Sequence, residues 1–335
     1  MTKKAKLMER EVNKKNIVAI NCAGIAHQKI GVIDSVTYMR VNSEATKNLA
    51  KTAAKSNPDV RFVFLSSVSV YGEGPQITPV PSSGATGQAQ ITQISQNKKM
   101  PHAKAQKRNN SSNEGISEDG ECWPSSDYAV SKLDAERRLI ALSDKGTLNS
   151  LVILRLAPVY DFDWSLNLDR RVFAPGKVAY LRFGSGSQRM SALARPNLVE
   201  FIDFLIHTPE EYASLSQVNS TGRGLRPGEI VSEFHRAGRL TQIRIFNVCD
   251  AESYEFNKII RVFKKSSIRP KRLVISVPLP CVWLATRIAG ALFPNKRNWL
   301  HSGYNKLTSS LVFNNDKMLG TGFNPRHSLE IVFAH

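Results

Sequence analysis

The chain has 335 residues, of which 41% are hydrophobic and 22% are charged, so it can bury a large core and does not belong to the disordered class. Its formal net charge is +18, and its four cysteines lie far apart, without a CxxC pair or a Cys/His cluster. This spacing argues against a metal site or a disulfide framework and is typical of a reducing cytoplasm.

The positive charge leaves several partners open. Part of it lies in segment 1–16, predicted to be a charged helix rather than a signal peptide, and part lies in segment 98–108. Nucleic acid would account for the charge electrostatically, but no helix-turn-helix, RNP-type strand or zinc module accompanies it. Anionic diphosphate substrates and a membrane face explain the charge at least as well.

The N-terminal half alternates buried strands with helices. Asn16–Gly24 is a continuous apolar run that ends in small residues, typical of a strand buried on both faces. Val41–Ser56 has helical spacing, and Arg61–Glu73 is a second buried strand whose end is rich in hydroxyl residues. Residues 74–125 are rich in Gln, Ser, Asn and Lys, which predicts a flexible surface insertion.

A helix follows from Asp127, and Ser150–Tyr160 is a third apolar strand. This alternation predicts an α/β protein with a parallel sheet and right-handed crossovers. The remainder is more mixed, with helices and one strand expected at Asn197–His207, Gln242–Val248, Tyr254–Lys265 and Val282–Phe293.

The most apolar run is Leu273–Phe293. Pro278 and Pro280 break it and Arg287 interrupts it, which leaves about 13 residues where a bilayer span needs about 20. We expect a buried core helix here, with a membrane-touching helix as the alternative.

Tyr128 and Lys132 are one helical turn apart, so the phenol and the ammonium project from the same face. A cation held there would lower the pKa of the phenol and let it act as an acid–base group near neutral pH. An unremarkable pair on an exposed helix is the alternative. Ser66 and Ser67 end the preceding strand, at the edge of the sheet where ligands bind.

Several landmarks in this order resemble the extended short-chain dehydrogenase/reductase superfamily, specifically the NAD-dependent epimerase/dehydratase family that includes UDP-hexose 4-epimerases. The sequences that carry the resemblance are INCAG, VNSEATKNLAKTA, FLSSVSVYG, YAVSK, LRLAPVY, GSGSQRMS, IFNVCD and DKMLGTGFNP. The resemblance implies an incomplete Rossmann-type, doubly wound parallel sheet within residues 1–160 and a smaller mixed substrate-binding region within 161–335, interleaved with late strands of the sheet.

The resemblance also implies roles for single residues. Tyr128 would exchange a proton with a sugar hydroxyl, Lys132 would bind the nicotinamide ribose and Ser67 would hydrogen-bond the reacting hydroxyl. The residues implied on the cofactor side are Ala23, Gly24, Asn42, Ser66, Tyr128 and Lys132. The residues implied on the substrate side are Ser67, Arg189 and Asn247, although Arg189 is equally well explained as a solvated loop charge.

The family opens with a strand, a GxxGxxG loop and a helix that binds the pyrophosphate of NAD. The first strand here corresponds to the family's fourth, so we expect an N-terminally truncated member whose NAD binding is weakened. A start codon assigned too late, a fragment completed by a partner and a decayed copy are the three explanations. Two substrate-side positions also depart from the family pattern, with Met190 in place of its arginine and Asp161 in place of its glycine.

The expected function is therefore NAD-dependent 4-epimerisation of a nucleotide sugar, of the kind used in surface polysaccharide synthesis, in a cytoplasmic protein that could form a homodimer. A dehydratase would have an acidic pair after the serine, where this chain has Val68 and Ser69. The alternative is an inactive family member that binds a sugar nucleotide or a partner chain.

Overall fold

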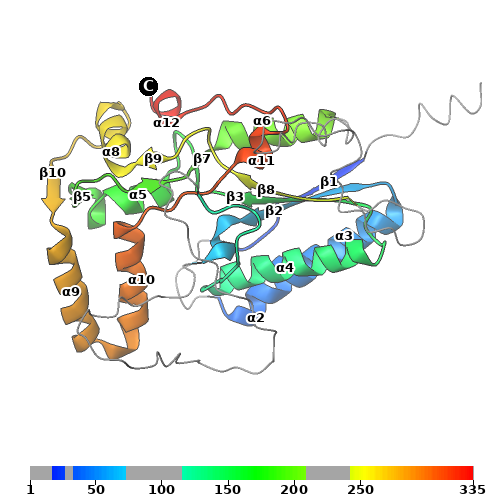
Figure 1. Ribbon diagram of the computed structural model, residues 1–335, viewed down its shortest axis with the longest axis horizontal. Helices are drawn as coiled ribbons and strands as arrows, with labels where there is room; N and C mark the ends of the chain where they lie inside the picture. The colour runs from blue at the N-terminus through cyan, green and yellow to red at the C-terminus, as the bar shows by residue number, and fades with distance from the viewer. Residues whose placement is uncertain (1–16, 27–32, 73–114, 209–241, 335) are drawn as a thin grey trace, which may run out of the picture.

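The computed structural model describes residues 17–26, 33–72, 115–208 and 242–334. The predicted helix in segment 1–16 and most of the predicted insertion lie outside these residues. Figure 1 shows a central sheet with helices on both faces and a smaller group of elements to one side of it.

The central sheet has four parallel strands in the order β1-β2-β3-β8. Their bounds are Val18–Asn21 for β1, Arg61–Ser67 for β2, Ser150–Leu156 for β3 and Gln242–Val248 for β8. The predicted α/β class and the four predicted strands are confirmed, with shorter ends at β1, β2 and β3. The last strand comes from the C-terminal half of the chain, so the two halves share one sheet.

Alternate residues of the strands face two different cores. Phe62 and Phe64 of β2 pack with Leu139 on one face, while Val63 of the same strand packs with Phe201 on the other. Because successive side chains of a strand point to opposite sides, a strand covered on both faces needs an unbroken apolar run. The continuous apolar pattern of β2 and β3 has this physical cause.

The two faces are covered by different helices, as Figure 1 shows. One face carries α3 (Ala45–Ser56) and α4 (Asp127–Asp144), with the short α2 (Ser35–Tyr38) and the π-helix η1 (Met39–Glu44) beside them. The other face carries α6 (Arg195–His207) and α11 (Asp316–Leu319). The sheet is therefore doubly wound.

A second core lies outside the sheet and contains Tyr160, Phe173, Tyr180, Phe263 and Phe333. The helices of this smaller region are α5 (Leu166–Val172), α8 (Phe256–Lys265), α9 (Leu279–Leu292), α10 (Arg297–Thr308) and α12 (Leu329–Val332). Its strands are β4 (Val159–Tyr160), β5 (Tyr180–Phe183), β6 (Arg189–Met190), β7 (Leu193–Ala194), β9 (Tyr254–Glu255) and β10 (Val274–Val277). The strands pair in twos, β4 with β7 and β5 with β10 in parallel and β6 with β9 antiparallel, as a mixed region requires.

Two expectations need correction. Residues 115–125, the end of the predicted insertion, pack against the sheet, because Glu118 is buried and accepts the backbone N–H of Asn247 at 2.8 Å. The predicted core helix around α9 is wrong, because no residue of α9 is buried. In the described part of the chain, no helix is both long and apolar enough to cross a membrane.

Candidate active site

Helix α4 presents Tyr128 and Lys132 to the carboxyl end of β2. The Ser126 side chain caps this helix by accepting the N–H of Ala129 at 3.2 Å, and Asp127 adds a negative charge to the first turn. Because the helix begins here, Tyr128 lies in its first turn and Lys132 lies one turn later on the same face. Both side chains line one cavity.

The end of β2 supplies the serine. Ser67 is the last residue of the strand, and its Oγ accepts the N–H of Ser69 at 3.2 Å, which starts the 3-10 turn η2 (Val68–Tyr71). The Ser67 side chain lies close enough to the Tyr128 hydroxyl to act on its pKa, which it lowers. The structure thus brings the predicted residues Ser67, Tyr128 and Lys132 to one end of the parallel sheet, where ligands bind in open α/β folds.

The cavity that Tyr128 and Lys132 line has a volume of about 160 Å³, and Ser66 rather than Ser67 is the strand-end serine in its wall. The segment after β1 contributes Cys22 and Gly24, the end of β2 contributes Ser66, and the end of β3 contributes Leu156. Three adjacent strands of the sheet and helix α4 therefore all contribute to its wall.

Lys132 is almost completely buried, and its ammonium donates to the backbone carbonyl of Leu65 at 2.8 Å. The same ammonium lies 4.8 Å from the centre of the Phe64 ring. Burial lowers the pKa of Lys132 to about 8, although the nearby Glu136 carboxylate acts in the opposite direction. At neutral pH the lysine is thus still a cation, and its burial makes the charged form less stable than in water.

The expected lowering of the Tyr128 pKa is not what the structure shows. Burial raises the pKa of Tyr128 above the ordinary value of the phenol, and only the hydrogen bond from Ser67 acts to lower it. The physical reason is that the Lys132 ammonium is bonded to the Leu65 carbonyl. In this state Tyr128 keeps its proton at neutral pH.

Asn42 holds the segment that forms one wall of the cavity. It lies in η1, is fully buried, and its Oδ1 accepts the N–H of Ile25 at 2.7 Å. Its Nδ2 donates to the Ile25 carbonyl at 3.1 Å and to the Ser131 hydroxyl at 3.0 Å. π-Helical turns are frequent at functional sites. Here the turn places one amide between the strand-end segment and helix α4.

Gly24 is the closest point of this segment to the lysine. A Cβ at Gly24 would lie 3.2 Å from both the Asn42 Oδ1 and the Lys132 Nζ, so a side chain there would occupy the space beside the ammonium. Ala23 next to it donates its N–H to the Asn21 side chain at 3.0 Å. The predicted cofactor-side residues Ala23 and Gly24 therefore lie in one segment, which Asn42 bonds from η1 through Ile25.

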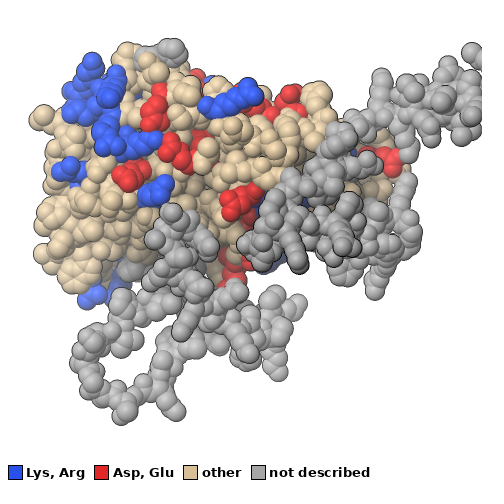
Figure 2. All heavy atoms as spheres, turned by 45° about the horizontal axis from the view of Figure 1, so that its top comes forward, with Lys and Arg blue, Asp and Glu red and all other residues tan. Residues whose placement is uncertain are grey.

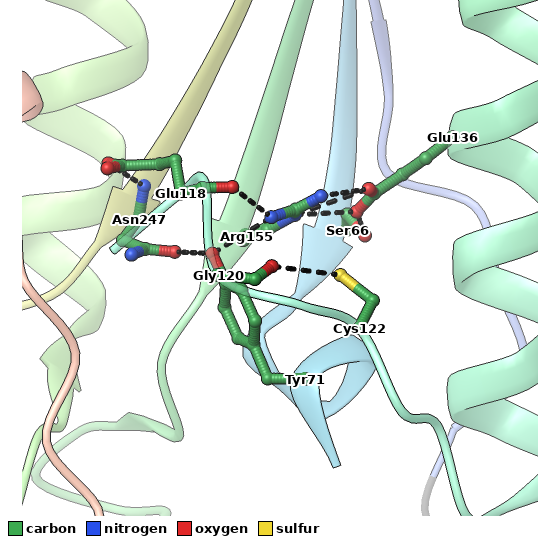
Figure 3. A network of polar contacts seen from close by, with 8 residues as sticks. All are labelled: Ser66, Tyr71, Glu118, Gly120, Cys122, Glu136, Arg155 and Asn247. Atoms are coloured by element: carbon green, nitrogen blue, oxygen red, sulfur yellow. Dashed lines mark hydrogen bonds and ion pairs between the residues drawn. The ribbon is translucent and has the colours of Figure 1, made fainter. Parts of the chain in front are cut away.

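A buried polar network lies beneath the site and connects α4, β2, β3 and β8 (Figure 3). The Ser66 hydroxyl donates to the carboxylate of Glu136, which pairs with the guanidinium of Arg155 at 2.8 Å. Arg155 also donates to the Tyr71 hydroxyl at 2.9 Å and to the Glu118 carbonyl at 3.0 Å. Ser66 thus lines the cavity as a residue while its hydroxyl points into the network.

Sequence reasoning missed Glu136, Arg155 and Glu118. Two signals were available: Glu136 lies one helical turn after Lys132, and Arg155 is a lone charge within the apolar strand LVILRLAP. A charge within a strand buried on both faces requires a partner, because an unpaired ion in the core is very costly.

Two of the three predicted substrate residues, Asn247 and Arg189, lie elsewhere in the structure. Asn247 is fully buried, and its Nδ2 donates to the carbonyls of Ile116 at 2.9 Å and Asn314 at 3.0 Å. Its Oδ1 accepts the Tyr71 hydroxyl at 2.7 Å. Asn247 is therefore a member of the buried network.

Arg189 lies on β6, where its Nη2 donates to the carbonyl of Ser253 at 3.2 Å. Neither Arg189 nor Asn247 lines the cavity beside Tyr128. Their contact with a substrate stays a prediction.

In the four described ranges, His, Cys, Asp and Glu nowhere gather in a group of three that could hold an ion. The predicted site residues are hydroxyl, amine and amide groups, which suit proton transfer and hydrogen bonding.

Comparison of the sequence with known proteins points to one family of enzymes. Residues 2–105 match the sequence model of the NAD dependent epimerase/dehydratase family. A UDP-glucose 4-epimerase of Vibrio cholerae is 29% identical over 227 residues. Over residues 2–105 the chain is similar to this family. The alignment with the V. cholerae enzyme covers 66% of this chain and 56% of that relative, so the chain spans little more than half of the relative's length.

Solved structures with the same fold include a UDP-glucuronic acid 4-epimerase from Bacillus cereus in complex with NAD, with a TM-score of 0.53 and 16% identity over 99% of this chain and 75% of the other. A short-chain dehydrogenase/reductase superfamily protein from Agrobacterium tumefaciens with bound NAD gives a TM-score of 0.55 and 15% identity over 95% and 77% of the two chains. At these identities the likeness concerns the fold. It confirms the predicted Rossmann-type architecture.

Proposed function

We propose that this protein interconverts nucleotide sugars at C4 in an NAD-dependent reaction, with Ser67, Tyr128 and Lys132 as its catalytic residues. The observation that carries the proposal is the convergence of these side chains. Tyr128 and Lys132 line one cavity at the carboxyl end of the sheet, and the Ser67 side chain is close enough to the Tyr128 hydroxyl to lower its pKa. A phenol, a hydroxyl and an amine in this arrangement suit proton exchange with an alcohol.

In the proposed reaction the phenolic oxygen of Tyr128 takes the proton of the sugar's C4 hydroxyl and later returns it. Ser67 would orient that hydroxyl, since its own Oγ is already within hydrogen-bond reach of Tyr128. The free protein starts with a protonated Tyr128, so a ligand that brings positive charge to the cavity must first lower the phenol's pKa.

The residues present suit one end of NAD. Gly24 leaves space beside the Lys132 ammonium, and Asn42 fixes the backbone around Gly24. Gly24, Tyr128 and Lys132 would hold the nicotinamide ribose, and the nicotinamide, when bound, supplies a reversible acceptor for the hydride at C4. Within the described ranges, no glycine-rich turn links a strand to a helix to receive the pyrophosphate.

The proposed substrate class rests on the relatives. The Vibrio cholerae relative is named for UDP-glucose, and MoeE5, which shares the fold with a TM-score of 0.51 and 17% identity over 95% of this chain and 76% of its own, was solved with UDP-glucose and NAD. The net charge of +18 also favours an anionic substrate such as a sugar diphosphate.

A second function, in which the chain binds a sugar nucleotide or a partner without turnover, is favoured by the size of the cavity. Its volume of about 160 Å³ is below the range of about 300–1,000 Å³ that is usual for ligand sites. The two functions make different predictions for cofactor binding.

The test is a titration of the full chain with NAD and NADH, followed by an assay of UDP-glucose and UDP-galactose interconversion. The proposal predicts saturable cofactor binding and turnover that falls at least about 100-fold in Tyr128→Phe, with the fold retained by circular dichroism. Tyr180→Phe is the matched control, because the Tyr180 hydroxyl bonds the Pro270 carbonyl away from the cavity. No saturable binding, or equal turnover in Tyr128→Phe, would contradict it.

A further inference from the structure

Helix α9 presents an apolar surface that nothing in the described chain buries. Leu284, Ile288 and Leu292 are four residues apart and form one stripe along the helix, and they are 53%, 52% and 68% exposed. Among the described elements, the helix packs mainly against α10. An apolar stripe of this kind is unusual on the surface of a soluble protein and marks a site of interaction.

Neighbouring residues enlarge this stripe into a continuous surface. Leu273 and Ile275 on the strand side are 82% and 51% exposed, and Trp283 and Phe293 add two half-exposed aromatic rings. We call this set, with Leu284, Ile288 and Leu292, the α9 surface. It joins β10 and α9, which follow one another in the chain.

The segment that carries the α9 surface has basic residues but no acidic ones. Residues 256–315 contain eleven Lys or Arg residues and neither Asp nor Glu. The exposed ones before and after the surface in sequence are Lys264, Lys265, Lys271, Arg272 and Arg297, and Arg287 lies on α9 itself. Figure 2 shows a broad uncharged area on the side of the molecule where α9 lies, with Lys and Arg interspersed with Asp and Glu above it and Lys or Arg below it. The surface is thus apolar in its middle and basic at its edges.

We propose that the α9 surface binds the interface of an anionic lipid bilayer. Apolar residues would enter the boundary between headgroups and acyl chains, while the flanking Lys and Arg contact lipid phosphates. Trp283 suits this position, because indole rings concentrate at membrane interfaces, and the Arg287 guanidinium lies 5.5 Å from its ring.

The length of α9 determines how it binds. Its 14 residues correspond to about 21 Å, which is less than the hydrocarbon thickness of about 30 Å. The helix therefore lies in the plane of the interface, with its axis parallel to the membrane.

The charge also argues against a second copy of the chain as the occupant. Two copies joined through the α9 surface would bring the same basic edges close together with no acidic residue of this segment to pair with them. A bilayer with anionic headgroups provides the complementary charge. The proposal uses neither the cavity nor a cofactor, so it stands apart from the proposed function.

The experiment is co-sedimentation of the full chain with vesicles of phosphatidylcholine containing phosphatidylglycerol, and with vesicles of phosphatidylcholine alone. We expect binding to the anionic vesicles that salt weakens, and a loss of at least about tenfold in Leu284→Ser/Ile288→Ser/Leu292→Ser. The matched control is Val36→Ser/Val199→Ser, which removes two valines that are 69% and 60% exposed on other helices.

A second measurement follows Trp283 directly. Its emission should shift to shorter wavelength on anionic vesicles, and Trp283→Phe should lose the shift while the chain still binds. The proposal is overturned if the triple variant binds like the control pair or if neutral vesicles bind equally well. It is also overturned if light scattering shows a dimer that the triple variant dissociates while the vesicles bind nothing, or if only an acidic protein binds the surface.

Discussion

The ammonium of Lys132 donates to the carbonyl of Leu65 at 2.8 Å, and this contact takes the place of the expected charge effect on Tyr128. Burial of a charged lysine beside a neutral partner lowers its pKa, here to about 8. The ammonium is therefore available to interact with a ligand in the cavity. Without that ligand, the buried charge destabilises the folded protein.

Lys132 should make the stability of the protein depend on pH. The folded pKa of about 8 lies below the ordinary 10.5, so between these values the unfolded chain binds a proton that the folded chain does not. The stability contribution of this group therefore rises with pH across that window, by up to about 3 kcal/mol. Lys132→Met should be more stable than the natural chain at pH 7, and the difference should shrink towards pH 10.

Urea unfolding of both chains at several pH values gives this difference, and other titrating groups cancel in it. Lys51→Met, which changes an exposed lysine on α3, is the control and should show no such trend. A constant difference between pH 7 and pH 10 would mean that Lys132 is not charged and desolvated in the folded protein.

The ion pair between Glu136 and Arg155 should be strongly cooperative. Glu136→Leu alone leaves the buried guanidinium without its carboxylate and should cost about 3–5 kcal/mol. Adding Arg155→Met should recover part of this loss, because the double variant has no unpaired charge. A double-mutant cycle by urea unfolding measures the coupling. If the losses in unfolding free energy of the two single variants simply add up in the double variant, Glu136 and Arg155 do not stabilise the fold as a pair.

Asn42→Ala should loosen the wall of the cavity. The variant loses the two hydrogen bonds to the Ile25 backbone and leaves those groups without their partner, at a cost of about 1–3 kcal/mol. Hydrogen exchange of the Ile25 amide should accelerate more than that of amides in β3. Asn57→Ala is the control, since its side chain accepts only a nearby exposed N–H at Asp59. Unchanged protection at Ile25 would show that other contacts hold the segment.

Gly24→Ala tests the cofactor end of the cavity. The added methyl would lie 3.2 Å from the Lys132 Nζ and fill space that the proposed nicotinamide ribose needs, so the Kd for NAD should rise at least about tenfold. Gly303→Ala is the control, because a methyl there meets no atom within 4 Å. Isothermal titration calorimetry gives both constants, and equal values would place the cofactor elsewhere.

The sequence predicted those features that depend on residues close together in the chain. β2 and β3 are covered on both faces, so their apolar runs identify them, and the one-turn spacing of Tyr128 and Lys132 places both in one cavity. Such features depend on residues a few positions apart. The family motifs then placed Ser67 at the correct end of the sheet.

Features that depend on distant residues could not be obtained in this way. The helix α9 was expected in the core because its composition is apolar, but composition does not say whether a second element covers a helix. The pKa of Tyr128 depends on where the Lys132 amine points, and that is decided by a carbonyl 67 residues away. The partner of Asn247, Tyr71, is likewise 176 residues distant.

The position of β8 has a consequence for how the polypeptide acquires its shape. The seven residues of β8 pair with β3, but they follow α5 and α6 in the sequence. The sheet therefore lacks its fourth strand until residue 248 has left the ribosome. Parallel pairing over such a sequence separation is entropically expensive and slow. We therefore expect the amino-terminal half to complete its packing only when β8 is available, and a chain cut between the halves to leave the edge of β3 unpaired.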